Sequence, residues 1–231
     1  MQVEQFSGSR DQWNAFVTAN GGGVMQSDQW GAMRTDLGWR PERLVVLEKG
    51  TIQAAGLVLK KPLPLGYQMY YLPEGPVVTK DDWQDAANQR AVTALFSHLR
   101  AQAGQDKAIL LKIDPHVRKQ DFPLGWLQGQ GFQDSPEDIQ PAFVAHVDLT
   151  RSPDEILAGM KQKGRYNIRY AERKGVEVGV GTSEDDLNTW YELTRASAKR
   201  QGITYRSLDY FKTFRKHFMG DDPQACFIIA R

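Results

Sequence analysis

A cluster of cations in the second half of the chain is the most conspicuous chemical feature of the sequence. From residue 161 to the glycine at 175, Glu172 is the one acid among them. The cations are Lys161, Lys163, Arg165, Arg169, Arg173 and Lys174. This density of positive charge favours binding of an anion such as a phosphate backbone, and the alternative is a solvated helix face.

Two arginines outside this cluster stand where phosphate oxygens are commonly bound. Arg34 is expected on a helix beside a tryptophan-rich surface, and Arg206 directly before the N-terminus of another helix. Guanidinium groups and helix N-termini both favour phosphate oxygens, so the two positions predict contacts to a diphosphate. For Arg206 the alternative is an ordinary loop arginine paired with Asp209.

Asp114 is the candidate for acid–base chemistry. It follows the apolar run AILLKI at residues 108–113, which predicts a central strand buried on both faces. The carboxyl ends of such strands display polar residues toward a ligand crevice. The alternative is a turn or capping aspartate next to Pro115.

Other chemistries lack the residues they need. The four histidines are scattered, so no metal site is predicted, and neither a GxSxG elbow nor a phosphate-binding glycine loop is present. The single cysteine, Cys226, excludes an intrachain disulfide and is expected to be a small buried hydrophobe. No cofactor is predicted.

Composition points to a soluble protein of the cytoplasm. The 231 residues carry a net charge of +1, so any nucleic-acid or phosphate site must be a local patch. The N-terminus has no apolar stretch typical of a signal peptide, and no run is long enough to span a membrane. The lone cysteine fits a reducing compartment.

The elements that must position these residues suggest an α/β fold with a mixed sheet covered on both faces. Helices are expected over residues 9–19, 27–36 and 81–103, and strands over 43–48, 52–60, 67–72, 108–113 and 143–149. After Leu149 a similar order restarts, with helices within 152–174, 183–199 and 207–218 and strands at 176–180 and 225–230.

This repetition predicts two related domains, residues 1–150 and 151–231, joined near Thr150. The helical region at 152–174 opens with Ser152, Pro153 and Glu155, which together predict a capping box. The last strand ends one residue before Arg231, which predicts that the second domain lacks its C-terminal part. The alternative is a complete protein with a C-terminal core strand.

Six stretches of the sequence together resemble the Fem/MurM (FemX-like) family of aminoacyltransferases, which form the interpeptide bridges of peptidoglycan. The matching stretches are VMQSDQWGAMRTDLGW, PEGPVV, AILLKIDPHV, IQPAFVAHVDLT, KQKGRYNIRYAERKGVEV and RQGITYRSLDYF. They cover nearly the whole chain in the family's order, and KGRYNIRYAERKGV followed by GITYRSLDYF is the most specific part.

The resemblance implies tandem GNAT-like domains and a transfer reaction. An amino acid would move from aminoacyl-tRNA to the side-chain amine of the stem peptide in a peptidoglycan precursor. The acceptor would be UDP-MurNAc-pentapeptide or a lipid-linked precursor, and in the second case the protein would contact the inner face of the membrane peripherally.

Residue roles follow from the resemblance by position. Arg34 and Arg206 match the residues that contact the acceptor's diphosphate, and Tyr210 matches a nearby tyrosine that helps to hold the acceptor. Asp114 matches the aspartate close to the acceptor cleft, where it is expected to orient the attacking amine or accept its proton. An acceptor-contacting tyrosine of some relatives corresponds to Ile109 here, so that contact is not carried over.

The basic segment is then expected to guide the tRNA backbone, and Tyr166 and Ile168 to be packing residues. The tRNA-contact candidates are Lys161, Lys163, Arg165 and Arg169. A chain without the end of its second domain is expected to lack much of the donor site and to be inactive. The competing hypotheses are a nucleic-acid-binding module that uses the basic patch at 161–174 and a coenzyme A-dependent N-acyltransferase. The second is disfavoured because no glycine-rich pyrophosphate loop follows residues 108–113.

Overall fold

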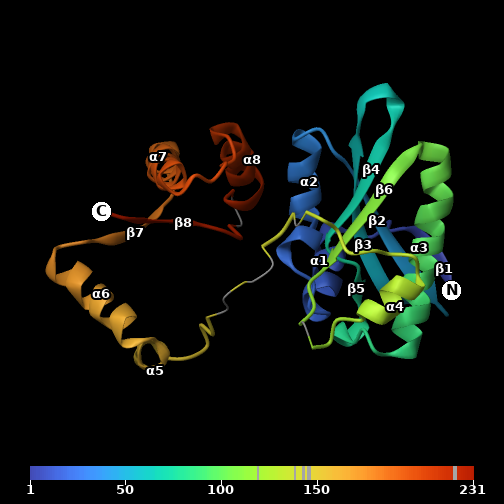
Figure 1. Cartoon of the computed structure of the whole chain (residues 1–231), viewed down its shortest axis with the longest axis horizontal. Helices are drawn as coiled ribbons and strands as arrows, with labels where there is room; N and C mark the ends of the chain where they lie inside the picture. The colour runs from blue at the N-terminus through green and yellow to red at the C-terminus, as the bar shows by residue number, and fades with distance from the viewer. Residues whose placement is uncertain (119, 138, 142–143, 145–146, 221–222) are drawn as a thin grey trace. The chain divides into compact units, whose positions relative to one another are not determined.

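The structure is a computed structural model of the 231-residue chain. It describes residues 1–118, 120–137, 139–141, 144, 147–220 and 223–231. The chain divides into two compact units, Met1–Ser135 and Pro136–Arg231, and each is described by itself (Figure 1). The predicted mixed α/β class is confirmed. The assignment of residues 1–150 and 151–231 as related domains stays a prediction.

The first unit is built on a mixed sheet in the order β1-β2-β3-β4-β6, with the short β5 beside β3. Its strands are β1 (Gln2–Gln5), β2 (Arg40–Glu48), β3 (Thr51–Pro62), β4 (Gln68–Glu74), β5 (Val77–Val78) and β6 (Ala108–Pro115). Strands β4 and β6 run parallel, and the other pairs run antiparallel. The parallel pair matters for the site because Asp114 lies at its carboxyl end.

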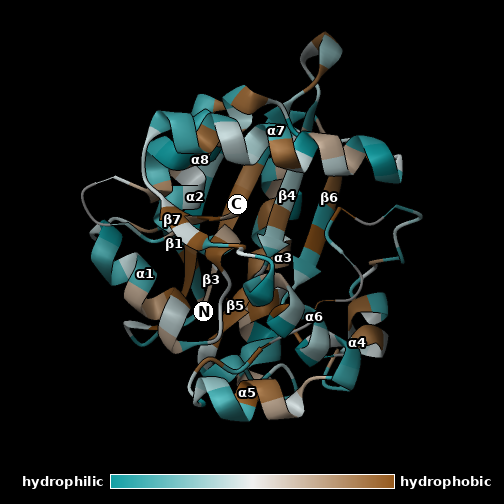
Figure 2. Ribbon diagram, turned by 90° about the vertical axis from the view of Figure 1, so that its left-hand side faces the viewer, coloured by the Kyte–Doolittle hydropathy of each residue, from teal (hydrophilic) through white to brown (hydrophobic). Residues whose placement is uncertain are grey.

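Helices cover both faces of this sheet (Figure 1). They are α1 (Arg10–Ala19), α2 (Asp28–Asp36), α3 (Ala86–Asp106) and α4 (Leu124–Gly129), with 3-10 turns η1 (Val24–Gln26), η2 (Pro64–Gly66) and η3 (Thr79–Asp81). Strand residues alternate between faces, so Val46, Ala54 and Val58 form one core with Leu95 and Phe96 of α3. Helices α1 and α2 cover the opposite face. The central strands are largely hydrophobic, brown in Figure 2, as burial on both faces requires.

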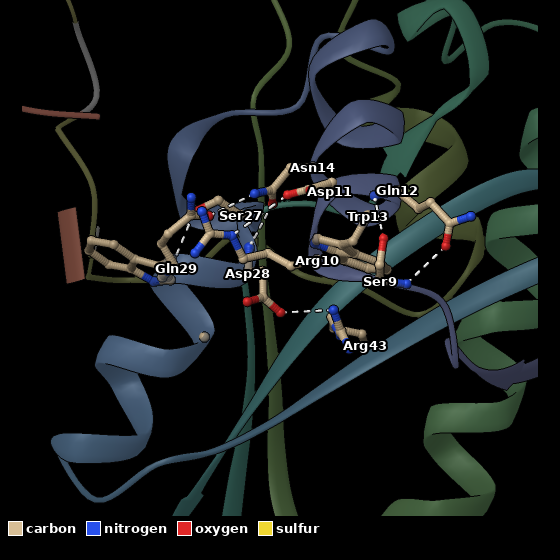
Figure 3. A network of polar contacts seen from close by, with 12 residues as sticks. Ser9, Arg10, Asp11, Gln12, Trp13, Asn14, Ser27, Asp28, Gln29 and Arg43 are labelled. Atoms are coloured by element: carbon tan, nitrogen blue, oxygen red, sulfur yellow. Dashed lines mark hydrogen bonds and ion pairs between the residues drawn. The ribbon is translucent and has the colours of Figure 1, made fainter. Parts of the chain in front are cut away.

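A polar network fixes α1 and α2 to the sheet (Figure 3). Ser9 and Gln12 form a capping box at the start of α1. Asn14 donates to Gln29 Oε1 at 2.8 Å and accepts from the backbone N–H of Asp28 at 2.9 Å. Arg43 of β2 forms an ion pair with Asp28 at 2.8 Å. The start of α2 is therefore tied to both α1 and β2.

Three expectations for residues 1–150 differ from the structure. Helix α3 begins at Ala86, since Asp85 caps it by accepting from the N–H groups at positions 87 and 88, and it ends at Asp106. In the described part of the chain β6 pairs with β4 alone, so the strand predicted to be buried on both faces is an edge strand in which Ile109 and Leu110 are exposed. An apolar run indicates a capacity for burial, and neighbours decide whether burial occurs. The third is the strand predicted at 143–149: Val144 and residues 147–149 are outside any strand, and residues 143, 145 and 146 lie outside the described residues.

The second unit packs two helices on a two-stranded antiparallel sheet. Its elements are α5 (Pro153–Gly159), α6 (Gln162–Arg173), β7 (Val178–Gly181), α7 (Glu184–Gln201), α8 (Leu208–Phe218) and β8 (Phe227–Ala230). Trp190 of α7 lies at ring-centroid distances of 4.9 Å from Phe211 of α8 and 4.7 Å from Phe227 of β8. These aromatic contacts join α7 to α8 and to β8.

Cys226 is exposed, so the prediction of a buried cysteine is wrong. Strand β8 begins one residue later, and its alternation buries Phe227 and Ile229 while Ile228 stays exposed. Cys226 precedes this alternation and gains no cover from it. Among the described residues, no helix is long and apolar enough to cross a membrane.

Candidate functional site

Arg34 lies in the last turn of α2, and the way this helix ends determines its environment. Gly38 adopts φ +81°, which lets its N–H bond to the carbonyl of Thr35 and lets the N–H of Trp39 bond to the carbonyl of Arg34 at 2.9 Å. This is a Schellman termination, which brings the residue after the glycine back over the last turn of the helix. The Arg34 guanidinium lies 4.3 Å from the centroid of the Trp39 ring.

A second cation shares the Trp39 ring. Lys61 Nζ, near the end of β3, lies 5.4 Å from its centroid, and Trp30 lies 6.0 Å from the Arg34 guanidinium. Cation–π contacts orient a guanidinium and leave N–H groups at its edge to donate to oxygens. Two positive charges therefore lie close to one indole, an arrangement that suits a polyanionic group.

Asp114 lies near the end of β6, where the sequence places it, beside the neighbouring parallel strand. The hydroxyl of Tyr71, on β4, donates to Asp114 Oδ2 at 3.3 Å. Tyr71 is almost fully buried and Asp114 partly exposed. A carboxylate held in this way can accept a further hydrogen bond, or a proton, with its remaining lone pairs.

Arg206 directly precedes a helix, as predicted. Ser207 caps α8 by accepting from the N–H of Tyr210 at 3.3 Å. The Arg206 guanidinium lies 5.4 Å from the Tyr210 ring centroid, and among the described side chains no ion pair joins it to Asp209. Tyr205 stacks on Phe211 at 5.4 Å, and burial raises the pKa of its hydroxyl. At the start of α8, the guanidinium of Arg206 is therefore in cation–π contact with the ring of Tyr210.

The region at 152–174 forms two helices, α5 and α6, and its basic residues lie on the second. Ser152 and Glu155 form the predicted capping box of α5. This helix ends at Gly159, and Met160 is extended before α6 begins. Arg165 spans this break: its Nη1 donates to the carbonyl of Met160 and to that of Ala158 at 3.3 Å. Arg165 thus satisfies the end of α5, and its guanidinium is already engaged.

The prediction that Tyr166 and Ile168 are packing residues is wrong. Both are exposed, and no residue of α6 is buried. Lys161 occupies the N-cap position without a side-chain capping hydrogen bond, and Lys163 and Arg169 lie exposed along the helix. The cations therefore stand on a solvent-facing helix together with aromatic rings.

The predicted residues are divided between the two units. Arg34 and Asp114 belong to the first unit, and Arg206, Tyr210 and the basic segment to the second. Sequence reasoning missed the partners Trp39, Lys61 and Tyr71. A glycine followed by tryptophan at the end of a helix could have predicted the first of these, but the other two become neighbours only through sheet pairing.

No group of three histidine, cysteine or carboxylate side chains within the described ranges could hold a metal ion.

Comparison with protein families gives a match along nearly the entire chain. The model of the FemAB family matches residues 9–126 and 124–231. The two matched segments meet in the mid-120s, so the same family description covers both compact units.

Individual proteins agree with the family match. The chain is 26% identical over 238 residues to a lipid II:glycine glycyltransferase of Staphylococcus aureus (strain MRSA252), a match that covers 98% of this chain and 55% of that protein. The crystal structure of FemX aligns with a TM-score of 0.80 at 24% identity, over 100% of this chain and 57% of that chain. The fold is thus shared with FemX, and the chain spans about half the length of the curated relatives it matches.

Proposed function

The chain belongs to the FemAB family, and from that premise we propose that it serves an aminoacyltransferase reaction of cell-wall synthesis. An amino acid moves from aminoacyl-tRNA to the side-chain amine of the stem peptide in a peptidoglycan precursor. The observation that carries the proposal is the family match along both units, joined by similarity to a lipid II:glycine glycyltransferase.

The chemistry asks little of the protein beyond positioning. The neutral amine of the acceptor attacks the carbonyl carbon of the aminoacyl ester. The new C–N bond forms as the ester C–O bond breaks, and the proton lost by the amine ends on the departing ribose oxygen. The ester is already activated, so alignment of amine and carbonyl can supply much of the rate.

We assign the proton-handling role to Asp114. Its carboxylate would orient the amine and accept its proton, and the hydrogen bond from Tyr71 would hold that carboxylate in one rotamer. Asp114→Asn keeps the size and removes the basic oxygen. In a form of the protein that carries out transfer, the variant should lower the rate about 100-fold or more, the usual contribution of a general base. The exposed Asp134→Asn serves as the control, and full transfer by Asp114→Asn would refute the role.

We assign the acceptor's diphosphate to Arg34 and Arg206, with Tyr210 beside the latter. Each guanidinium rests on an aromatic ring that orients it. Calorimetry should give tighter binding of UDP-linked pentapeptide than of the free pentapeptide. Arg34→Ala or Arg206→Ala should weaken that binding about 10-fold or more, as for a lost charge-assisted hydrogen bond. Equal affinity for the two ligands would contradict the assignment.

Donor identity separates this proposal from its competitors. Any transfer that the chain carries out should require charged tRNA and should not respond to coenzyme A. Acylation of an amine from acetyl-coenzyme A would favour an N-acyltransferase. RNA binding without any affinity for the precursor would favour a plain nucleic-acid-binding module. We further propose that a lipid-linked acceptor would be met at the inner face of the membrane.

A further inference from the structure

Helix α6 carries two tyrosine rings that stack on each other in solvent. The ring centroids of Tyr166 and Tyr170 lie 6.0 Å apart with an interplanar angle of 20°. The two residues are 58% and 46% exposed. Because burial does not hold these rings, they form an open aromatic platform of about one helical turn.

Cations lie on the same face of the helix as the rings. Lys163, Arg173 and Lys174 are three residues before, seven after and eight after Tyr166, spacings that return to one side of a helix. All three are exposed, and Lys174 Nζ lies 5.6 Å from the centroid of the Tyr170 ring. We call these five residues the tyrosine face.

The opposite side of α6 differs in character. Gly164 and Ala171, which lie there, are only partly exposed, and Ile168 and Glu172 share that side. Rings and cations are thus interleaved on one face, and the aliphatic residues lie on the other. Only one large aliphatic side chain, Ile168, lies on that side, whereas a helix that lies in a membrane surface carries several large apolar side chains opposite its cations.

Interleaved rings and cations match the chemistry of unpaired nucleotides. Each base offers a π-face that stacks on a tyrosine ring, and each phosphate offers oxygens to a lysine or arginine. A duplex offers phosphates but hides the faces of its bases. The tyrosine face therefore favours single-stranded over double-stranded RNA.

We propose that the tyrosine face binds unpaired RNA nucleotides by stacking bases on Tyr166 and Tyr170, with phosphates held by Lys163, Arg173 and Lys174. In the reaction proposed above, these nucleotides belong to the unpaired 3′ end of the aminoacyl-tRNA. This last step rests on the proposed function, whereas binding of single-stranded RNA does not.

Fluorescence anisotropy with a labelled, unstructured 12-nucleotide RNA tests the proposal on the 231-residue chain. Wild type should bind this strand more tightly than a duplex of the same sequence. Tyr166→Ala combined with Tyr170→Ala should weaken binding about 10-fold or more, given the usual contribution of base stacking. The matched pair Tyr166→Phe and Tyr170→Phe keeps the rings and should stay within about 2-fold.

Further controls isolate the face and its charges. Tyr67→Ala removes an exposed tyrosine of the first unit and should leave binding unchanged. Lys163→Gln with Lys174→Gln should reduce the dependence of affinity on salt. Circular dichroism checks that each variant is folded. Folding should be retained because the substituted side chains are exposed.

Three results would overturn the proposal: equal binding by the alanine pair, equal affinity for the duplex, or tyrosine-dependent binding to phosphatidylglycerol vesicles without RNA binding. The assay contains no precursor and no charged tRNA. Single-stranded RNA binding together with acyl transfer from coenzyme A would therefore refute the proposed function and leave the tyrosine face standing.

Discussion

Gln26 lies where strands β3 and β4 separate. Its side-chain amide forms hydrogen bonds with backbone groups of the two strands that no longer pair with each other there. The paired part of β3 and β4 ends at Leu59 and Tyr71. Beyond it, Gln26 Oε1 accepts from the N–H of Leu57 at 2.8 Å, and its Nε2 donates to the carbonyl of Pro73. Gln26 is fully buried, so water cannot satisfy these groups in its place.

Replacing this amide should destabilise the first unit. Gln26→Leu keeps the volume but leaves a buried N–H and a buried carbonyl unpaired, at about 1–3 kcal/mol each. Urea unfolding should show a loss of about 2–6 kcal/mol. Gln128→Leu, at an exposed position of α4, is the control and should change little. A stability equal to wild type for Gln26→Leu would show that the strands close over the gap.

Asp106, at the end of α3, joins three strands through polar contacts. It accepts from the hydroxyl of Tyr70 and, at 3.1 Å, from Lys60, which also pairs with Glu42 at 2.7 Å. The hydrogen bond from Tyr70, with help from Lys60, lowers the pKa of Asp106 below its ordinary value of 3.8. Burial and the neighbouring Asp106 raise the pKa of the Tyr70 hydroxyl, so this donor keeps its proton at neutral pH.

This linkage predicts how stability falls in acid. A lowered carboxyl pKa means that the unfolded chain binds the proton first as pH drops, so the contribution of Asp106 is complete above about pH 3.8 and is lost as pH falls through the lower folded value. Asp106→Asn should be less stable at pH 7 and should lose less stability between about pH 5 and pH 3. Urea titrations across that range measure this difference. Asp134→Asn should follow wild type, and parallel profiles for Asp106→Asn and wild type would contradict the linkage.

The positions of the candidate site residues could be predicted because they depend on local signals. Helix caps and stops place Arg34 and Arg206, and the end of an apolar run places Asp114. The exposure of Tyr166 and Cys226 could not be predicted, because it depends on which elements cover them. Sequence hydrophobicity reports the preference of a side chain and carries no information about its neighbours.

Among the elements, the end of α2 is the one on which the proposed diphosphate contact of Arg34 depends. The positive φ of Gly38 allows the Schellman bonds that bring Trp39 over Arg34. Apart from its two chain neighbours, no heavy atom of the described residues lies within 4 Å of the position that a Cβ would take at this glycine, so backbone conformation alone opposes a side chain. The same type of ending occurs at Gly175 after α6 and at Gly202 after α7.

Gly38→Ala should therefore be costly without any clash. A left-handed alanine costs about 1–2 kcal/mol, which should lower the midpoint of thermal unfolding. Relaxation of the turn would also move Trp39 from Arg34 and weaken binding of the UDP-linked precursor. Gly104→Ala is the control, because it lies within α3 with open space around it and should stabilise or leave stability unchanged. Unchanged precursor affinity in Gly38→Ala would show that precursor binding does not depend on the conformation of this turn.

The order of the elements was predictable to a greater extent than their pairing. The helices from residues 10, 28, 184 and 208 begin directly after serines, whose caps are read from sequence with little ambiguity. Strand β6 was predicted as an element, but its place at the edge of the described sheet depends on contacts with distant residues. Long-range pairing leaves no trace in a local pattern.

At the scale of the whole molecule, the two units differ in the size of their apolar cores. The first unit has a continuous core shared by α3, α4 and the sheet. In the second unit the described buried apolar side chains are Leu187, Ala198, Phe218, Phe227 and Ile229. Stability grows with the apolar area that folding removes from water, so the first unit should be the more stable.

Unfolding should therefore occur in two steps, with the second unit lost first. Hydrogen exchange should show faster exchange in α7 and α8 than in α3 and the central strands, because exchange reports the local free energy of opening. Gln26→Leu should lower the midpoint of the later step alone, in which the first unit unfolds. A single cooperative transition, shifted as a whole by that variant, would show that the units unfold together.

The exposed thiol of Cys226, together with the tryptophans, allows the unfolding of each unit to be followed by its own fluorescence signal. Five of its six tryptophans, at positions 13, 30, 39, 83 and 126, lie in the first unit, and Trp190 lies in the second. Intrinsic fluorescence therefore follows mainly the first unit. A maleimide dye attaches at the chain's single cysteine, just before β8, and follows the second unit without any engineered residue. One sample, read at two wavelengths, then records the melting of both halves.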